Sequence, residues 1–156
     1  MMDYNLLITI HLASVILLLG VGGGSAFYKF MADRSGNIEV IVHTNKMVVL
    51  ADWLFTTPSA ILQPLTGVML MRLLNISFWT PWLLTAILLY AFASILWLIA
   101  VYLQLRMKKM ALLAQKNEEV LGKDYFTLVN YWIYLGVFSF FSMGGVFGLM
   151  VFKTGS

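Results

Sequence analysis

The chain has 156 residues, of which 61% are hydrophobic and only 11% are charged. A soluble domain has about a quarter of its residues charged, so the composition predicts an integral membrane protein with a single domain, residues 1–156. The absence of cysteine excludes disulfides, thiolate metal sites and cysteine catalysis. The net charge of +3 is small and the basic residues lie at the ends of apolar segments, which argues against a nucleic-acid partner.

Four apolar segments are long enough to cross a bilayer as helices, which takes about 20 residues each. We expect these spans at about residues 4–28, 47–71, 81–105 and 127–151, with Pro81 in the first turn of the third helix. Four spans joined by short connections predict an all-α fold, an up-and-down transmembrane four-helix bundle. The first segment has no basic start and too long an apolar run for a signal peptide.

Basic residues are concentrated in the connections 29–46 and 106–124. By the positive-inside rule, these two connections are expected in the cytoplasm and both termini on the outer, periplasmic side. We expect the segment after Arg106 to extend the third helix along the cytoplasmic surface. The predicted protein is therefore multi-pass, with the lipid bilayer as its main partner.

Polar side chains lie along one face of the otherwise apolar second span. At roughly 100° per residue on a helix, six of them share a narrow face: Asn45, Asp52, Thr56, Ser59, Gln63 and Thr66. This polar stripe is either a hydrogen-bonded seam that fixes helix register or a site for a ligand, a proton or an ion.

An ionisable group inside a membrane is costly, so Asp52 is expected to face the bundle interior and to bond a neighbouring helix. Its candidate partners at similar depth are Tyr131, Tyr134 and Ser25. Pro58 and Pro64 free the carbonyl groups four residues before them, which would line the same interior.

The first span has a second group of residues on one helix face: His11, Ser14, Gly22 and Ser25. An imidazole inside a span can relay protons, bind a metal or ligate haem iron, or it can be a structural hydrogen-bonding group. Two glycine clusters predict close approach of helix backbones: Gly20 and Gly24 with Gly22, Gly23 and Ser25 beside them, and Gly144, Gly145 and Gly148.

Haem b is the cofactor candidate, with His11 as the iron ligand. A membrane b-type haem usually needs two imidazoles at one depth, and His43 is the other histidine of the chain. We expect His43 near the cytoplasmic surface, about 20–25 Å from His11 along the membrane normal, which is too far for one haem. Ligation by His11 alone, or by two His11 side chains across a homodimer axis, stays open.

Six short segments recur in the order expected of a known family: DYNLLITIHL, MADRSGN, ADWLFTT, TPWLL, ILWL and LMVFK. Together they cover nearly the whole chain and resemble a bacterial family of four-span membrane proteins without an assigned function. Asp52, Trp53, Phe55 and Thr56 match its most specific motif, and His11 matches its first-helix histidine. The resemblance implies a protein of the bacterial inner (cytoplasmic) membrane.

That family is similar, more remotely, to the CopD copper-resistance membrane proteins and the HemJ-type protoporphyrinogen oxidases. The remote similarity implies a four-helix bundle that holds a porphyrin near His11. The chain departs from it in the span 81–105, which has no lysine or histidine where HemJ-type enzymes use a lysine in a later span. A lone histidine with scattered methionines is also a poor set of copper ligands.

Three functions follow from these observations. The first is binding of haem, a porphyrin or a related hydrophobic redox ligand, with His11 as its anchor. The second is transport of protons or a small solute along the stripe around Asp52. The third is a non-catalytic accessory role in a larger membrane complex or a homodimer. The sequence assigns no enzyme activity.

Overall fold

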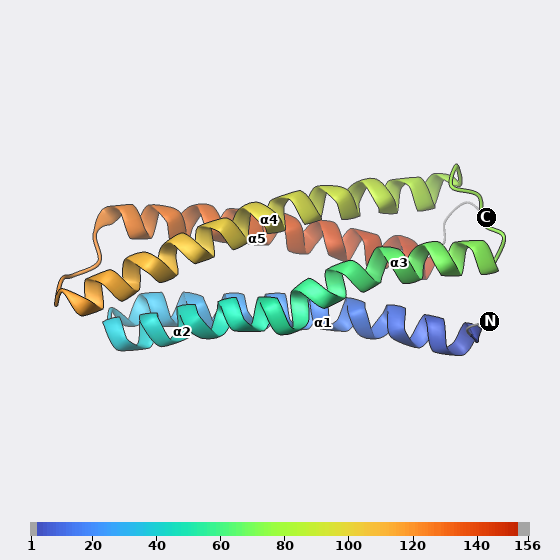
Figure 1. Ribbon diagram of the computed structural model, residues 1–156. Helices are drawn as coiled ribbons and strands as arrows, with labels where there is room; N and C mark the ends of the chain where they lie inside the picture. The colour runs from blue at the N-terminus through green and yellow to red at the C-terminus, as the bar shows by residue number, and fades with distance from the viewer. Residues whose placement is uncertain (1–2, 153–156) are drawn as a thin grey trace.

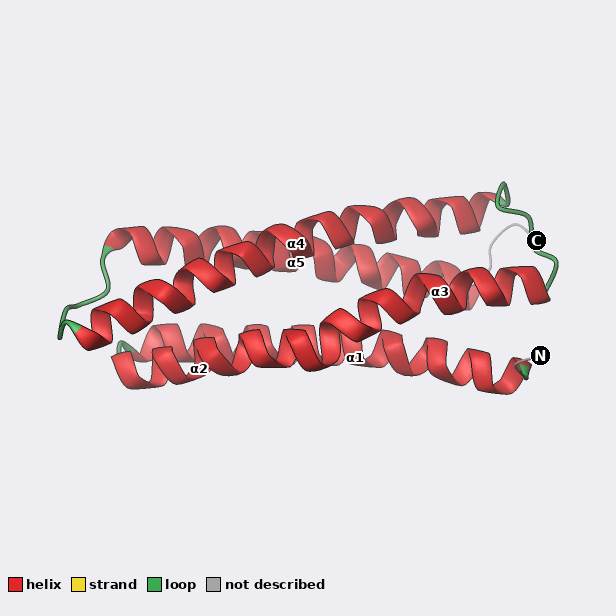
Figure 2. Cartoon of the chain, viewed as in Figure 1, coloured by secondary structure: helices red, strands yellow, loops and turns green. Residues whose placement is uncertain are grey.

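The computed structural model describes residues 3–152 and places most of them in helices (Figure 2). The elements are α1 (Tyr4–Ser35), α2 (Ile38–Ala51), the π-helical turn η1 (Asp52–Thr56), α3 (Thr57–Leu73), α4 (Pro81–Lys116) and α5 (Lys123–Phe152). Because α2, η1 and α3 are continuous, they form one of four helices that are long and apolar enough to cross a membrane. No strand occurs between residues 3 and 152. The predicted all-α fold with four membrane helices is confirmed.

The helices extend well beyond the predicted spans at one end of the bundle. The connection expected at 29–46 is helical except for a turn at Gly36 and Asn37. Gly36 adopts a left-handed φ of 65°, which suits a residue without Cβ. The Asn37 side chain caps α2 by accepting from two backbone N–H groups. Hydrophobicity marks where a helix meets lipid rather than where the helix ends, so the spans predicted from it were shorter than the helices.

The two ends of the bundle differ in what they contain (Figure 1). The start of α1, the α3–α4 loop and the last turn of α5 lie at one end, here called the terminal end. The α1–α2 turn and the α4–α5 connection lie at the other, the turn end. Helix α1 packs along α2 and α3, and α4 packs along α5, whereas α2 joins these two halves by packing against α4. Helix α3 makes few close approaches to α4, so the halves are less tightly joined towards the terminal end.

The hydrophobic core accordingly lies towards the turn end. It is built from α2, α4 and α5 by Ile41, Val42, Val48, Ala100, Met107, Ala111, Tyr125, Val129 and Trp132. Small side chains on α4 let the neighbouring helices approach closely there. Many other large apolar side chains face outward, among them Phe141 with 73% of its surface exposed. An apolar outer surface of this kind suits contact with lipid chains.

The second membrane helix changes direction at η1. Pro58 has no N–H, and its ring would clash with the carbonyl of Leu54 in a regular helix. The chain relieves this clash with a π-helical turn, in which the N–H of Thr57 bonds to the carbonyl of Asp52 five residues earlier. Figure 1 shows α3 leaving the direction of α2 at this point. Asp52 therefore lies at the bend of the helix.

The two glycine clusters meet neighbouring helices at only some of their positions. A Cβ added at Gly20, Gly24, Gly144 or Gly148 would meet no other side chain or neighbouring helix within 4 Å. The prediction of close packing is wrong at these four positions. It is confirmed at Gly23 and Gly145 of the same clusters, where an added Cβ would lie 3.5 Å from Phe140 and 3.3 Å from Leu89.

Candidate functional site

All six residues of the predicted polar stripe are buried: Asn45, Asp52, Thr56, Ser59, Gln63 and Thr66. Asp52 has only 6% of its surface exposed, so the prediction that it faces the interior is confirmed. Its predicted partners on α5 are wrong, because Tyr131 and Tyr134 are 60% and 65% exposed; α5 packs against α4 through its opposite face. Instead, Asp52 accepts a hydrogen bond of 2.9 Å from Thr56 of its own helix, so the predicted bond to a neighbouring helix is not among the hydrogen bonds of residues 3–152.

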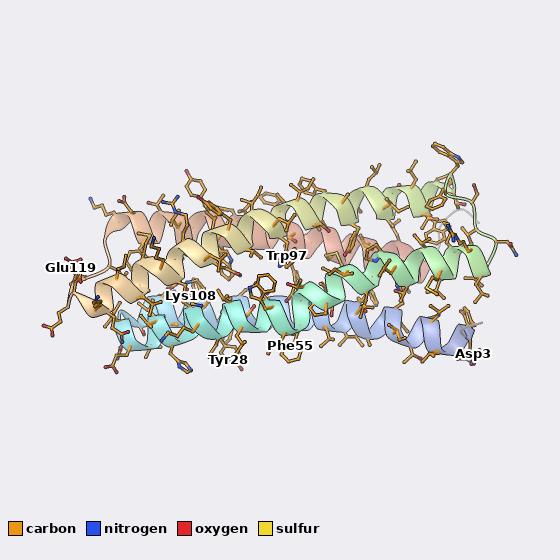
Figure 3. All side chains as sticks on the ribbon, viewed as in Figure 1. Asp3, Tyr28, Phe55, Trp97, Lys108 and Glu119 are labelled. Atoms are coloured by element: carbon orange, nitrogen blue, oxygen red, sulfur yellow. The ribbon has the colours of Figure 1, made fainter. Side chains whose placement is uncertain are left out.

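Asp52 lines a cavity of about 370 Å³ bounded by α1, η1, α3, α4 and α5, here called the Asp52 cavity. Its wall is mostly apolar, with a few polar side chains. Three buried polar atoms of its lining residues have no hydrogen-bond partner within residues 3–152, namely Asp52 Oδ2, Gln104 Oε1 and Trp97 Nε1. Figure 3 shows Trp97 pointing from α4 towards the other half of the bundle, while Tyr28 and Phe55 point away from it. Since most buried polar atoms in proteins are bonded, this wall is unusual.

His11 contacts α3 through both of its ring nitrogens. Nδ1 lies 2.8 Å from Thr66 Oγ1, and Nε2 lies 3.1 Å from Gln63 Nε2. The Thr66 hydroxyl donates its proton to the carbonyl of Leu62 at 2.7 Å, so towards His11 it accepts. This arrangement puts the imidazole proton on Nδ1 and leaves the Nε2 lone pair to accept from the Gln63 amide.

His11 and Gln63 line a second cavity of about 370 Å³, here called the His11 cavity, between α1, α3, α4 and α5 towards the terminal end. The rest of its wall is almost entirely apolar and includes Met71 and Met150. Gln63 Oε1 is buried and finds no hydrogen-bond partner in the described part of the chain. Gln63 is thus the second residue of the polar stripe, after Asp52, with an unbonded polar atom, and it lies at the His11 cavity.

Tyr90 of α4 lines both cavities. Its hydroxyl donates a 2.6 Å hydrogen bond to the carbonyl of Ala60. That carbonyl lacks its usual helical partner, because the residue four positions later is Pro64. The expected interior-facing carbonyl is therefore present, and a side chain of another helix satisfies it.

The residues predicted around His11 do not form one site. His11 lines its own cavity, whereas Gly22 and Ser25 line the Asp52 cavity. Ser14 is buried, and its hydroxyl bonds to the carbonyl of Ile10 at 2.8 Å. The Ser25 hydroxyl bonds to the carbonyl of Gly22 at 3.2 Å, so Ser25 is not the predicted partner of Asp52. These residues share one face of α1, but they are several turns apart along the helix. They therefore lie at two different cavities.

Sequence reasoning missed three cavity residues on α4: Tyr90, Trp97 and Gln104. They recur every seven residues, which is two turns of a helix, so they share one face. Buried small residues repeat beside them with the same period, at Ala86, Ala93 and Ala100. This seven-residue spacing within an apolar segment could have identified the inward face of α4 from the sequence.

A buried polar network near the turn end was also missed. Lys29 Nζ lies 2.8 Å from Asp33 Oδ2 and 3.1 Å from Tyr125 Oη. The Tyr125 hydroxyl donates to Asp33 Oδ1 at 2.7 Å and accepts from Asn45 Nδ2 at 2.9 Å. Lys29 is 1% exposed, so it is a buried ion-pair partner and not a cation at the membrane surface. The spacing of Lys29 and Asp33, four residues apart on a helix, was the signal for this pair.

Residues 5–154 match the family model described as "Predicted integral membrane protein (DUF2269)". The chain belongs to this family. The match includes the Asp52 cavity, the buried network and the His11 cavity apart from Tyr4, and the family description agrees with the four membrane-length helices. No curated protein and no solved structure matches the chain. The remote similarity to CopD and HemJ-type proteins is therefore not shown by these comparisons.

The described residues of this DUF2269 chain contain no group of three or more His, Asp or Glu side chains suited to a metal ion. A haem needs fewer side-chain ligands than a free metal ion, because the protein supplies only one or two ligands to its iron. His11 fits that role in one respect, since Thr66 accepts its Nδ1 proton as orienting partners of ligating histidines do. Gln63 occupies Nε2, so an iron atom there would have to displace the amide. Because His11 faces its own bundle, a haem shared by two copies is disfavoured.

Proposed function

We propose that this protein binds a mostly apolar ligand in the His11 cavity, and that the ligand is haem, a porphyrin or a related hydrophobic redox molecule. Ligand sites are typically apolar hollows with a few placed polar groups. The His11 cavity has this character, with His11 and Gln63 on an otherwise apolar wall. The observation that carries the proposal is the buried imidazole whose Nδ1 proton is fixed by Thr66 and whose Nε2 is held only by a side-chain amide.

Different residues of the His11 cavity would contact different parts of such a ligand. His11 would hold a haem iron through Nε2, and Thr66 would keep the imidazole ring in place through Nδ1. Gln63 would offer its free Oε1 to a polar group of the ligand. The apolar wall would exclude water from the bound molecule. A bound haem would supply one-electron redox chemistry.

His11→Ala is expected to reduce the haem that copurifies from haem-sufficient cells by about tenfold or more, since even supporting contacts at metal sites carry about 10–100-fold in affinity. His43→Ala is the matched control, because His43 is the exposed histidine of α2. The Soret absorbance relative to protein gives the haem content. Added imidazole should restore haem to His11→Ala. Equal loss in both variants, or no loss in His11→Ala, contradicts the proposal.

The buried polar residues favour a second candidate function, movement of protons or a small solute. They form three groups along the bundle, around His11, around Asp52, and around Asn45 with Tyr125. Buried ionisable groups inside membranes often mark such routes. No hydrogen bond within residues 3–152 joins one group directly to the next, so conduction would need water between them. Ligand binding therefore has the stronger support.

Asp52→Asn distinguishes this second candidate from the first. The fold should be kept, because an amide oxygen can still accept from Thr56. If the stripe conducts protons, the variant should reduce proton flux into proteoliposomes, followed with an enclosed pH-sensitive dye, to the level of protein-free vesicles. Wild-type flux no greater than that level, or an unchanged flux in the variant, rules the transport function out.

We also place the turn end in the cytoplasm and the terminal end on the outer face of the bacterial inner membrane. Exposed basic residues of the turn end support this orientation, including Arg34, Lys46, Arg106 and Lys116. Lys29 is not one of these exposed basic residues, because it is buried and forms an ion pair with Asp33. At the terminal end, Arg72 is the basic residue among those that the structure describes, whereas Lys153 lies outside the described residues.

Single-cysteine labelling tests this orientation, since the chain has no cysteine of its own. An impermeant maleimide applied to intact spheroplasts should label Ser77→Cys in the α3–α4 loop and not Lys116→Cys at the end of α4. Both positions are exposed, so accessibility alone does not separate them. Labelling of Lys116→Cys but not Ser77→Cys would reverse the orientation.

A further inference from the structure

We propose that the Asp52 cavity is a second ligand site, which shares no unbonded polar atom with the His11 cavity. Its ligand class is a phenol- or hydroquinone-headed molecule with an apolar tail, which enters from the lipid between α1 and α5. This site goes beyond the proposed function, because none of its unbonded polar atoms belongs to the His11 cavity.

The unbonded polar atoms define the head of the ligand. Asp52 and Gln104 are 6% and 5% exposed, and their atoms Oδ2 and Oε1 accept no hydrogen bond from residues 3–152. Trp97 Nε1 is a buried donor with no acceptor in the same part of the chain. A complementary head must therefore both donate to oxygen and accept from nitrogen. A hydroxyl group does both.

The rest of the wall favours an aromatic head. Rings from three helices, α1, α4 and α5, line the cavity: Phe30, Tyr90, Trp97, Trp132, Phe140 and Phe141. Such rings pack well against another ring in edge or offset arrangements. The volume of about 370 Å³ lies at the small end of ligand pockets, which suits a head group whose tail continues into lipid.

The side between α1 and α5 gives a route from the lipid. These two helices share few contacts compared with α4 and α5. Gly22 of α1 and Gly136 of α5 both line the cavity, and a Cβ added at either would meet no other side chain or neighbouring helix within 4 Å. Phe141 and Val137 line the same cavity and are 73% and 46% exposed on the outer surface. The cavity therefore reaches the surface that faces lipid.

A lipid acyl chain or water alone would match only part of the cavity wall. A lipid acyl chain would fill the apolar part and leave the polar atoms of Asp52, Gln104 and Trp97 unbonded. Water would bond those atoms and leave the aromatic surface wet. A phenolic head on an apolar tail matches both parts.

The test compares 4-nonylphenol with its methyl ether, 4-nonylanisole, which lacks the hydroxyl donor. Binding to the full chain in lipid nanodiscs is followed by quenching of tryptophan fluorescence. The phenol should bind about tenfold more tightly than the ether, as loss of a buried hydrogen bond predicts. Asp52→Leu should remove this preference, and His11→Ala should keep it. Equal binding of the two compounds to the wild type would show adventitious partitioning and overturn the proposal.

Leucine substitutions at two glycines of α1 test the location. Gly22→Leu fills the cavity and should weaken phenol binding about tenfold or more, by the loss of the hydrogen bond and ring contacts. Gly20→Leu adds the same side chain outside the cavity, where space is also open, and should bind as the wild type does. Unchanged binding in Gly22→Leu overturns the proposal. Gly136→Leu replaces Gly22→Leu if that variant does not fold.

Discussion

Lys29→Met is expected to lower the free energy of unfolding by about 3–5 kcal/mol, the cost of leaving a buried charge without its partner. The substitution keeps most of the side-chain volume and removes the cation that bonds both Asp33 and Tyr125. Asp33 is 7% exposed, so the substitution would leave a buried carboxylate without its cation. Unfolding of the purified protein in mixed micelles, followed by circular dichroism, gives the change in free energy.

Two variants separate the ion pair from general effects of removing a cation. Lys29→Met combined with Asp33→Leu should recover most of the loss, because an apolar pair can replace a buried ion pair at little cost. Arg34→Met removes the exposed cation near the end of the same helix and should change stability by less than about 0.5 kcal/mol. Equal destabilisation in the single and double variants, or in Lys29→Met and Arg34→Met, contradicts the assignment.

Tyr90→Phe is expected to destabilise the bundle by about 1–3 kcal/mol, because it leaves the Ala60 carbonyl without a donor. Pro64 prevents the helix itself from supplying an N–H to that carbonyl, and the 2.6 Å bond from the Tyr90 hydroxyl takes its place. The same unfolding measurement gives the loss. Tyr102→Phe, at an exposed tyrosine of α4, is the control and should change stability by less than about 0.5 kcal/mol.

Pro64→Ala supplies the decisive comparison for this bond. An alanine there restores an N–H that can reach the Ala60 carbonyl, so the Tyr90 hydroxyl becomes redundant. The cost of Tyr90→Phe should therefore fall in the Pro64→Ala background, and the double-mutant cycle gives the coupling. An identical cost in both backgrounds would mean that the hydroxyl does not replace the missing helical bond.

The interior position of the stripe could be predicted from the sequence because it depends on one helix alone. A charged group is costly in lipid, and the polar residues around Asp52 share its face, so one rotation of the helix buries them all. The side chains of other helices that line a cavity with Asp52 could not be predicted in this way. They depend on how α4 and α5 are rotated about their own axes, and that rotation puts Gln104 inside and Tyr131 outside.

Lys29 shows a second limit of sequence reasoning. Near the end of an apolar segment a lysine reads as a cation at the membrane surface, which is its commonest position. Its burial depends on Tyr125, which lies 96 residues away in the chain and closes the network with Asp33. The glycines of α1 show the opposite case, because small residues predict close packing whereas Gly22 instead borders a cavity.

The absorption spectrum of the wild-type protein, purified from haem-sufficient bacterial membranes and recorded before and after addition of haem, tests the proposed function most directly. Binding in the His11 cavity predicts a Soret band with haem and protein in equal amounts, shifted from the band of free haem in the same detergent. A spectrum without a bound chromophore, even after haem is supplied in excess, would contradict a haem-binding function for this bundle.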